Sequence, residues 1–296
     1  LRKMIDDDPA DVRAWSMYAA TTMQMCDATA DEAEKSKLAR ELEESVIPEM
    51  EKQSRSPVDY YVLTTKAFVL MRKGREKRDA GREEALSKAR EALLAAAKER
   101  PDVQATQDLV LGLDISLNDT VQAESHAREV LRRNRKAPLA NYVMGSLALQ
   151  KGDYSDAEAY LRRAADASRP VSLAQNDLAE VYRRTKRYGE AERYARMAIR
   201  SDPALYVAYE TLGAVLMDSG GDLDEAEELV GRACELSKGE GGREEDVRML
   251  VSLARVQIAK GDATRGKMTL RKVQSRIKEL SDFERREFED LQKSVR

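Results

Sequence analysis

Few residues of this chain have the type and spacing that catalysis requires. The single histidine, His126, stands near Glu124 and Arg128, and no motif pairs it with a nucleophile, so we interpret it as a surface or packing residue. The two cysteines, Cys26 and Cys234, make neither a disulfide framework nor a metal-ligand cluster. Phosphate-binding glycine loops, H-E-x-x-H and G-x-S-x-G are absent from the sequence. We therefore predict no enzymatic activity, no metal and no cofactor.

The densest basic stretch of the sequence is the next group of residues that could bind a ligand. Acidic residues are interleaved with it, at Glu180, Glu190 and Glu192, and the whole chain has a formal net charge of -3. A nucleic-acid surface needs a wider positive face with aromatic residues that stack on bases. We therefore predict a solvated helix with local ion pairs, and no nucleic-acid partner. The stretch comprises Arg183, Arg184, Lys186, Arg187, Arg193, Arg196 and Arg200.

The composition indicates which elements hold these residues. Charged residues make up 35% of the chain and aromatic residues 5%, with only seven prolines, which favours long helices over a sandwich or barrel. No stretch approaches the roughly 18 apolar residues of a membrane helix, and the mean hydropathy is -0.62. We predict a soluble, all-α chain without membrane insertion, cytoplasmic or, if a preceding segment carries a signal, periplasmic.

Small residues recur with a period of 34 or 35 residues, which indicates a repeat protein. One series is Ala123, Ala157, Ala191 and Ala226. Two further series keep the same register: Val130, Ala164, Ala198 and Ala233, and Leu111, Gly145, Ala179 and Gly213. Small side chains allow two helix axes to approach within roughly 8 to 10 Å, so each series predicts a helix contact.

Each unit reads as two amphipathic helices joined by a tight polar turn. Over residues 104–240 we expect six consecutive antiparallel helices, with turns near Asn118, Lys151-Gly152, Lys186-Arg187 and Gly220-Gly221. Three pairs have the spacing of a capping box: Ser155 with Glu158, Asp222 with Glu225, and Ser281 with Glu284.

These residues resemble the tetratricopeptide repeat, whose pattern is W-x2-L-G-x2-Y, then A-x3-F, then A and P. Leu178-Ala179-x2-Tyr182, Tyr188, Ala191, Ala198 and Pro203 match it, while Lys186 stands where a turn glycine is usual. The resemblance implies a right-handed superhelical solenoid of antiparallel helix pairs, with about seven repeats and a C-terminal capping helix. The regular repeats are 104–137, 138–171, 172–205 and 206–240.

Weaker units extend the register in both directions, so we predict a single solenoid over 1–296. A repeat at 247–280 follows a glycine-rich linker, and 281–296 is predicted as the capping helix. Residues 12–57 form a divergent repeat whose second helix, from about Asp31 to Lys52, contains Pro48. Residues 58–103 form another, with a charged insertion between its helices at Arg72 to Arg82, a candidate contact loop for an acidic partner. Residues 1–11 read as the remnant of a preceding repeat, so we expect a longer protein.

In the family, the first helices of successive repeats line a concave groove that takes up peptides or partner helices, and the resemblance implies the same here. The residues we predict to face it are Asp108, Ile115, Tyr142, Ser146, Leu149, Asn176, Glu180, Arg183, Glu210, Ala214, Met217, Val251, Arg255 and Ile258. Tyr142 and Ser146, then Asn176 and Glu180, stand where related domains clamp the acidic tails of chaperones with lysine and asparagine. We therefore disfavour a carboxylate-clamp role.

Three functions remain open on these grounds. The first is a protein-interaction scaffold that binds a peptide or partner helix in the groove. The second is a structural or regulatory region of a larger enzyme or cell-envelope protein whose active or anchoring part lies upstream. The third is self-association through the groove or the open first repeat.

Overall fold

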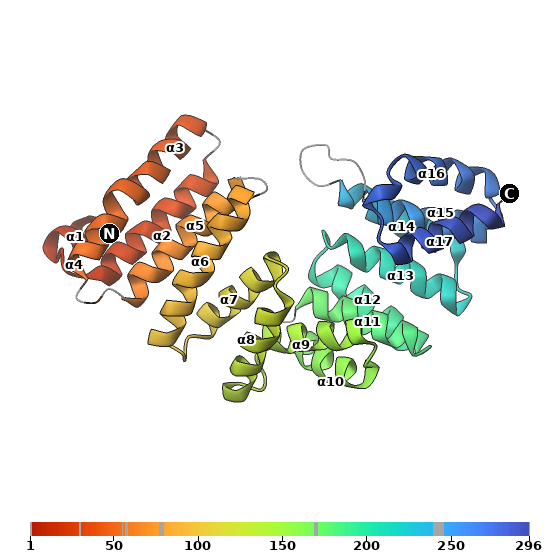
Figure 1. Cartoon of the computed structure of the whole chain (residues 1–296), viewed down its shortest axis with the longest axis horizontal. Helices are drawn as coiled ribbons and strands as arrows, with labels where there is room; N and C mark the ends of the chain where they lie inside the picture. Colours follow the sequence, from red (N-terminus) through yellow and green to blue (C-terminus); the bar gives the residue numbers. More distant parts are fainter. Residues whose placement is uncertain are drawn as a thin grey trace. The chain divides into compact units, whose positions relative to one another are not determined.

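The structure, a computed structural model, describes residues 2–29, 31–54, 56, 59–76, 80–168, 171–238 and 246–295. All regular structure in these ranges is helical and no strand occurs within them (Figure 1). The all-α class predicted from the sequence is therefore confirmed. The chain divides into two compact units, Leu1–Arg133 and Asn134–Arg296, which are described separately, and a single array over 1–296 stays a prediction.

The first unit packs its helices in sequential order around small buried residues. Ala67 on α5 and Ala89 on α6 are fully buried where these two long helices pack along each other. The helices of the unit are α1 (Arg2–Asp7), α2 (Val12–Ala28), α3 (Glu32–Glu41), a π-helical turn (Leu42–Val46), α4 (Ile47–Gln53), α5 (Tyr60–Glu76), α6 (Ala80–Glu99), α7 (Gln104–Ser116) and α8 (Thr120–Arg133).

The long helix predicted from about Asp31 to Lys52 is observed, with a π-helical turn inside it. α3 ends at Glu41, the π-helical turn follows directly, and α4 continues from Ile47. Pro48 accounts for the π-helical turn, because proline has no amide hydrogen to donate and its ring clashes with the carbonyl group four residues earlier. Leu42 and Val46 on the turn are buried, so the widened turn still contributes to the core.

The charged insertion is not a loop in its described part, contrary to our prediction. α5 runs through Arg72 to Glu76 and α6 begins at Ala80, while 77–79 lie outside the described residues. Arg72 is buried and Lys73 pairs with Glu43 at 2.5 Å. Arginine, lysine and glutamate are good helix formers, so the extra residues lengthen the helices.

The second unit consists of four stacked helix pairs and a terminal helix. Its main core gathers alanines with a few large side chains, among which Tyr182 and Leu178 are fully buried. The helices are α9 (Pro138–Lys151), α10 (Tyr154–Ala165), α11 (Ser172–Arg184), α12 (Tyr188–Ser201), α13 (Tyr206–Ser219), α14 (Leu223–Ser237), α15 (Val247–Ala259), α16 (Ala263–Ser275), a 3-10 turn (Ile277–Glu279) and α17 (Asp282–Ser294).

The number of helices over 104–240 was predicted wrongly. The described residues of this span hold eight, α7 to α14, because each of the four units contributes two. The turns lie where the sequence placed them: Gly152 and Gly220 have φ of 77° and 72°, and Asn118 and Lys186 occupy the same left-handed conformation at 55° and 60°. At Lys186 this conformation strains a residue that has a Cβ atom, whereas glycine adopts it freely.

Two of the three predicted helix starts are observed. Ser281 and Glu284 form a complete capping box, and the Asp222 carboxylate accepts from the amides of Asp224 and Glu225. The pairing of Ser155 with Glu158 is wrong, because α10 begins at Tyr154, two residues earlier than this pairing requires, and the Asp153 carboxylate caps it.

The small positions are closely packed. A Cβ atom added to Gly145 would lie 2.6 Å from Leu161 Cγ, and one added to Gly213 would lie 2.6 Å from Val230 Cγ2. Ala157 on α10 and Ala191 on α12, the second helices of their pairs, are fully buried at the equivalent contacts. The approach of each helix pair therefore depends on these residues, as the repeat spacing predicted.

We expect Ala191→Leu, or Ala157→Leu, to lower the free energy of unfolding by about 1 to 3 kcal/mol, because the added atoms have no space in the core. Urea denaturation of the variant and the wild type measures this difference. Glu228→Ala, an exposed change on α14, should stay within about 0.5 kcal/mol. Equal stability of the leucine variants and the wild type would show that the helix contact is not where the register places it.

Candidate functional site

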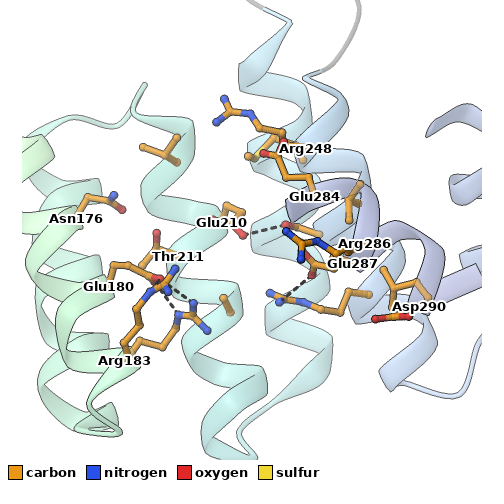
Figure 2. A pocket seen from close by; sticks show the side chains of 18 of the residues that line it. Asn176, Glu180, Arg183, Glu210, Thr211, Arg248, Glu284, Arg286, Glu287 and Asp290 are labelled. Carbon is orange, nitrogen blue, oxygen red and sulfur yellow. Dashed lines mark hydrogen bonds and ion pairs between the residues drawn. The ribbon is translucent and has the colours of Figure 1, made fainter. Parts of the chain in front are cut away.

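An open pocket in the second unit is lined by the first helices of three repeats, α11, α13 and α15, and by the terminal helix α17. We call these first helices the inner helices and the second helix of each repeat the outer helix. Its volume is about 970 Å³, within the usual range for ligand sites. Figure 2 shows charged side chains from these helices turned toward one opening. Members of the predicted groove set that line it are Asn176, Glu180, Arg183, Glu210, Ala214, Val251 and Arg255.

Seven members of the predicted groove set lie outside the lining of this pocket: Asp108, Ile115, Tyr142, Ser146, Leu149, Met217 and Ile258. Tyr142 on α9 is half-buried and packs against the main core, and burial raises its pKa, with the charge of Asp177 as a further cause. Ser146 lies near both Tyr142 and Asp177 and acts to lower the pKa of both groups. Met217 packs against the core cluster around Leu216. Tyr142 and Ser146 therefore support Asp177 from the neighbouring helix.

An ion-pair network forms one wall of the pocket. The Arg183 guanidinium donates two bonds to Glu180, at 2.7 and 2.8 Å, and also pairs with Asp218 on α13. Arg184 Nε donates to the same Glu180 carboxylate at 2.6 Å. Burial alone would raise the pKa of Glu180, but the two arginines outweigh it and the pKa is lowered. The same contacts raise the pKa of Arg183. These groups are charged and fixed in position.

The opposite wall comes from α15 and α17. Arg255 Nη1 donates to Glu287 at 3.2 Å, which ties the terminal helix to α15. The Nε atom of Arg255 is buried and has no hydrogen-bond partner. A bound molecule with an acceptor at this position would remove an unsatisfied donor, which costs free energy when it stays buried.

Two carboxylates of the pocket are desolvated without a paired cation. Burial raises the pKa of Asp177 to about 6, against lowering by hydrogen bonds from Asn176 and Ser146. Burial also raises the pKa of Glu210, whose Oε1 accepts from Ser252 Oγ at 2.9 Å. Both side chains keep some exposed surface, yet the inner face surrounds them with protein on most sides. Protein atoms therefore replace much of the water that would stabilise their charge.

Metal binding and membrane insertion find no support in the described residues. They contain no group of three or more histidine, cysteine, aspartate or glutamate side chains that could hold a metal ion. Within the same part of the chain, no helix has both the length and the apolar character needed to cross a bilayer.

His126 has a structural contact that the sequence did not indicate. Its Nδ1 lies 2.6 Å from Oδ2 of Asp114, a side chain with no exposed surface. Arg90 Nη1 donates to Asp114 at 3.2 Å and to Asp119 at 2.9 Å. The network joins α6, α7 and α8, so His126 serves packing, one of the two roles expected for it.

The basic stretch is ion-paired, as predicted. Arg187 bonds to Glu158 and Glu190, and Arg196 bonds to Glu192 and Glu225. These contacts link successive outer helices. Arg187 and Arg196 are therefore part of the packing between repeats.

Sequence reasoning missed the residues that α17 and the neighbouring helix positions bring to the pocket. Asp177 lies one residue beyond the predicted inner row, and Arg248 lies one turn before it on α15. From α17 come Glu284, Arg286, Glu287, Asp290, Leu291 and Ser294. The only available signal was the polar side of the capping helix, whose placement depends on tertiary packing.

Comparison with known proteins agrees with the repeat pattern. A family model described as Tetratricopeptide repeat matches residues 115–172 and 142–205. No curated protein matches the chain in sequence.

Several solved structures share the fold. A tetratricopeptide repeat protein from Parabacteroides merdae is 17% identical over 94% of this chain and 98% of that one, with a TM-score of 0.55. PilW, a type IV pilus biogenesis factor, is 17% identical over 77% and 96%, with a TM-score of 0.56. The Cut9–Hcn1 structure of the APC/C is 12% identical over 86% and 44%, with a TM-score of 0.60. At such identities the likeness concerns the fold alone.

Proposed function

Because this chain is a tetratricopeptide-repeat protein, we propose that it is an interaction scaffold that binds a segment of a protein partner in the pocket of α11, α13, α15 and α17. The observation that carries the proposal is the pocket itself, which is large, open and lined by residues from four helices. Repeat arrays use such inner surfaces for recognition, since side chains at equivalent positions of successive helices form one continuous face.

The polar chemistry of the pocket supports a peptide-like ligand. Arg255 Nε and Asn176 Oδ1 are a buried donor and a buried acceptor without partners in the described structure. A polypeptide segment offers both acceptors and donors along its length. The ion pairs of Arg183 and Glu180 hold the surrounding groups in place before binding, which lowers the entropic cost of association.

Peptide display on the purified chain tests the proposal. We expect random twelve-residue peptides to be enriched on the wild type, and Arg183→Ala to weaken the selected peptides by roughly 5- to 100-fold, the usual effect of losing a buried anchor. Isothermal titration calorimetry gives the dissociation constants. Alanine at Tyr142 would also disturb the core, so any binding test of this residue should use Tyr142→Phe.

The control must lie on an outer helix and have no part in the packing. Glu158 on α10 is unsuitable because it bonds to Arg162, Tyr182 and Arg187. Glu228→Ala on α14 is a better choice, and its dissociation constants should stay within twofold of the wild type. Equal losses in Arg183→Ala and Glu228→Ala, or no enriched peptide, would rule out binding in this pocket. A concentration-dependent mass in light scattering without peptide would instead indicate self-association.

A further inference from the structure

One end of the pocket carries a buried acceptor that no group of the described structure satisfies. Asn176 is 7% exposed and lines the pocket, and its Oδ1 has no hydrogen-bond partner. Its Nδ2 donates to Asp177 Oδ1 at 3.4 Å. Reversing the amide would place its oxygen against that carboxylate, so the orientation with Oδ1 free is the favoured one. Figure 2 shows Asn176 on α11 and Glu210 on α13 at the same opening.

The two carboxylates at this end have no cation of their own. Within the described part of the chain, Asp177 and Glu210 make no ion pair; Asp177 accepts a hydrogen bond from Asn176, and Glu210 accepts one from Ser252, both neutral side chains. Burial raises the pKa of both carboxyl groups; no cation among the described residues opposes it at Asp177, and at Glu210 the charges of Arg255 and Arg183 oppose it without cancelling it.

Four arginines of the pocket form their ion pairs with other carboxylates, and the charges of Arg255 and Arg183 offset only part of the effect of burial on the pKa of Glu210. Arg183 and Arg184 pair with Glu180, Arg248 pairs with Asp246, and Arg255 pairs with Glu287. The fifth, Arg286, donates from Nε to the backbone carbonyl of Asp282 on its own helix. The end formed by Asn176, Asp177 and Glu210 is therefore rich in acceptors and poor in donors.

We propose that this end of the pocket receives a basic side chain, a lysine ammonium or an arginine guanidinium, from the partner segment. The inference rests on the proposed function and names the chemistry of the ligand. An ammonium carries three donors and no acceptor, which matches two carboxylates and one amide oxygen. A partly buried cation beside a carboxylate gains more from Coulomb attraction than an exposed one does, because the surrounding dielectric is lower.

Four pools of labelled peptides provide the test. Each peptide has seven residues, with uncharged residues at random around a central lysine, arginine, norleucine or glutamate. Fluorescence anisotropy with the wild type should give at least tenfold tighter binding of the lysine and arginine pools than of the norleucine pool, and the weakest binding of the glutamate pool. The preference should fall at higher salt, because it is electrostatic in origin.

Isosteric variants locate the preference. In Asp177→Asn/Glu210→Gln the ratio between the lysine and norleucine pools should fall below threefold, whereas the matched outer-helix control Glu228→Gln should keep it. Circular dichroism melts confirm that each variant is folded. A preference that survives in the double variant would overturn the inference.

The remaining outcomes separate the inference from the proposed function. If the wild type binds the lysine and norleucine pools equally, and Arg183→Ala still weakens both, the basic-residue inference is wrong and pocket binding stands. If no pool binds the wild type, both are wrong.

Discussion

Replacing Phe288 with alanine is expected to lower the free energy of unfolding by about 3 to 5 kcal/mol, the usual cost of removing a buried aromatic ring. Phe288 on α17 is 1% exposed and belongs to the core cluster of Leu250, Leu270 and Val295. Chemical denaturation followed by circular dichroism measures the loss. Glu289→Ala, the next residue on the same helix but exposed, should cost less than about 0.5 kcal/mol.

The same change should loosen α17 before the rest of the unit unfolds. Among the described side chains of α17, Phe288 is the largest that is fully buried. The polar contacts of the helix, such as Arg255 with Glu287, are partly exposed and contribute little on their own. Hydrogen exchange of residues 282–294 should therefore become faster, with smaller changes in α11 and α13. Since α17 forms one wall of the pocket, peptide affinity should also fall. Unchanged exchange in 282–294 would show that Phe288 does not hold the helix.

The parts of the fold that the sequence predicted are those determined within one repeat. Ala157 and Ala191 mark helix contacts because only small side chains fit there, and this requirement recurs every 34 residues. The turns recur for the same reason. Even Lys186 takes the left-handed turn conformation, because the Arg187 amide still donates to the Tyr182 carbonyl at 2.8 Å and closes the helix end.

The features that the sequence did not predict depend on contacts between repeats or on local departures from the repeat. The π-helical turn at Leu42–Val46 reflects how Pro48 is accommodated while Leu42 and Val46 stay buried. The insertion near Arg72 reads as a loop by comparison with a regular repeat, yet its residues extend the helices. Periodicity carries no signal for either.

The pocket was predicted only in part for a similar reason. Counting from the small position of each first helix identified one row, which includes Asn176, Glu180 and Glu210. It excluded Asp177, one residue further round the helix, because a row of equivalent positions is narrower than the actual opening. The residues from α17 required knowledge of where a terminal helix docks.

Asp177→Asn is expected to raise the free energy of unfolding by about 1 to 3 kcal/mol at pH 7.5, and to bring no gain at about pH 3.5. The pKa of Asp177 is raised from 3.8 to about 6 in the folded chain. Between these values the folded state holds a proton that the unfolded state has lost, so wild-type stability falls as pH rises. Each pKa unit corresponds to about 1.4 kcal/mol, and the lost hydrogen-bond acceptor makes the gain smaller than the full shift.

Urea denaturation of both proteins at the two pH values measures this difference. Glu228→Gln removes the same charge from an exposed site and should change stability by less than about 0.5 kcal/mol at either pH. An equal gain at both pH values, or a loss at pH 7.5, would show that the charge of Asp177 does not strain the fold. A residue whose charge weakens the folded state is understandable where that charge serves recognition. If Asp177→Asn is more stable at pH 7.5 and also loses preference for lysine peptides, the same uncompensated charge explains both results.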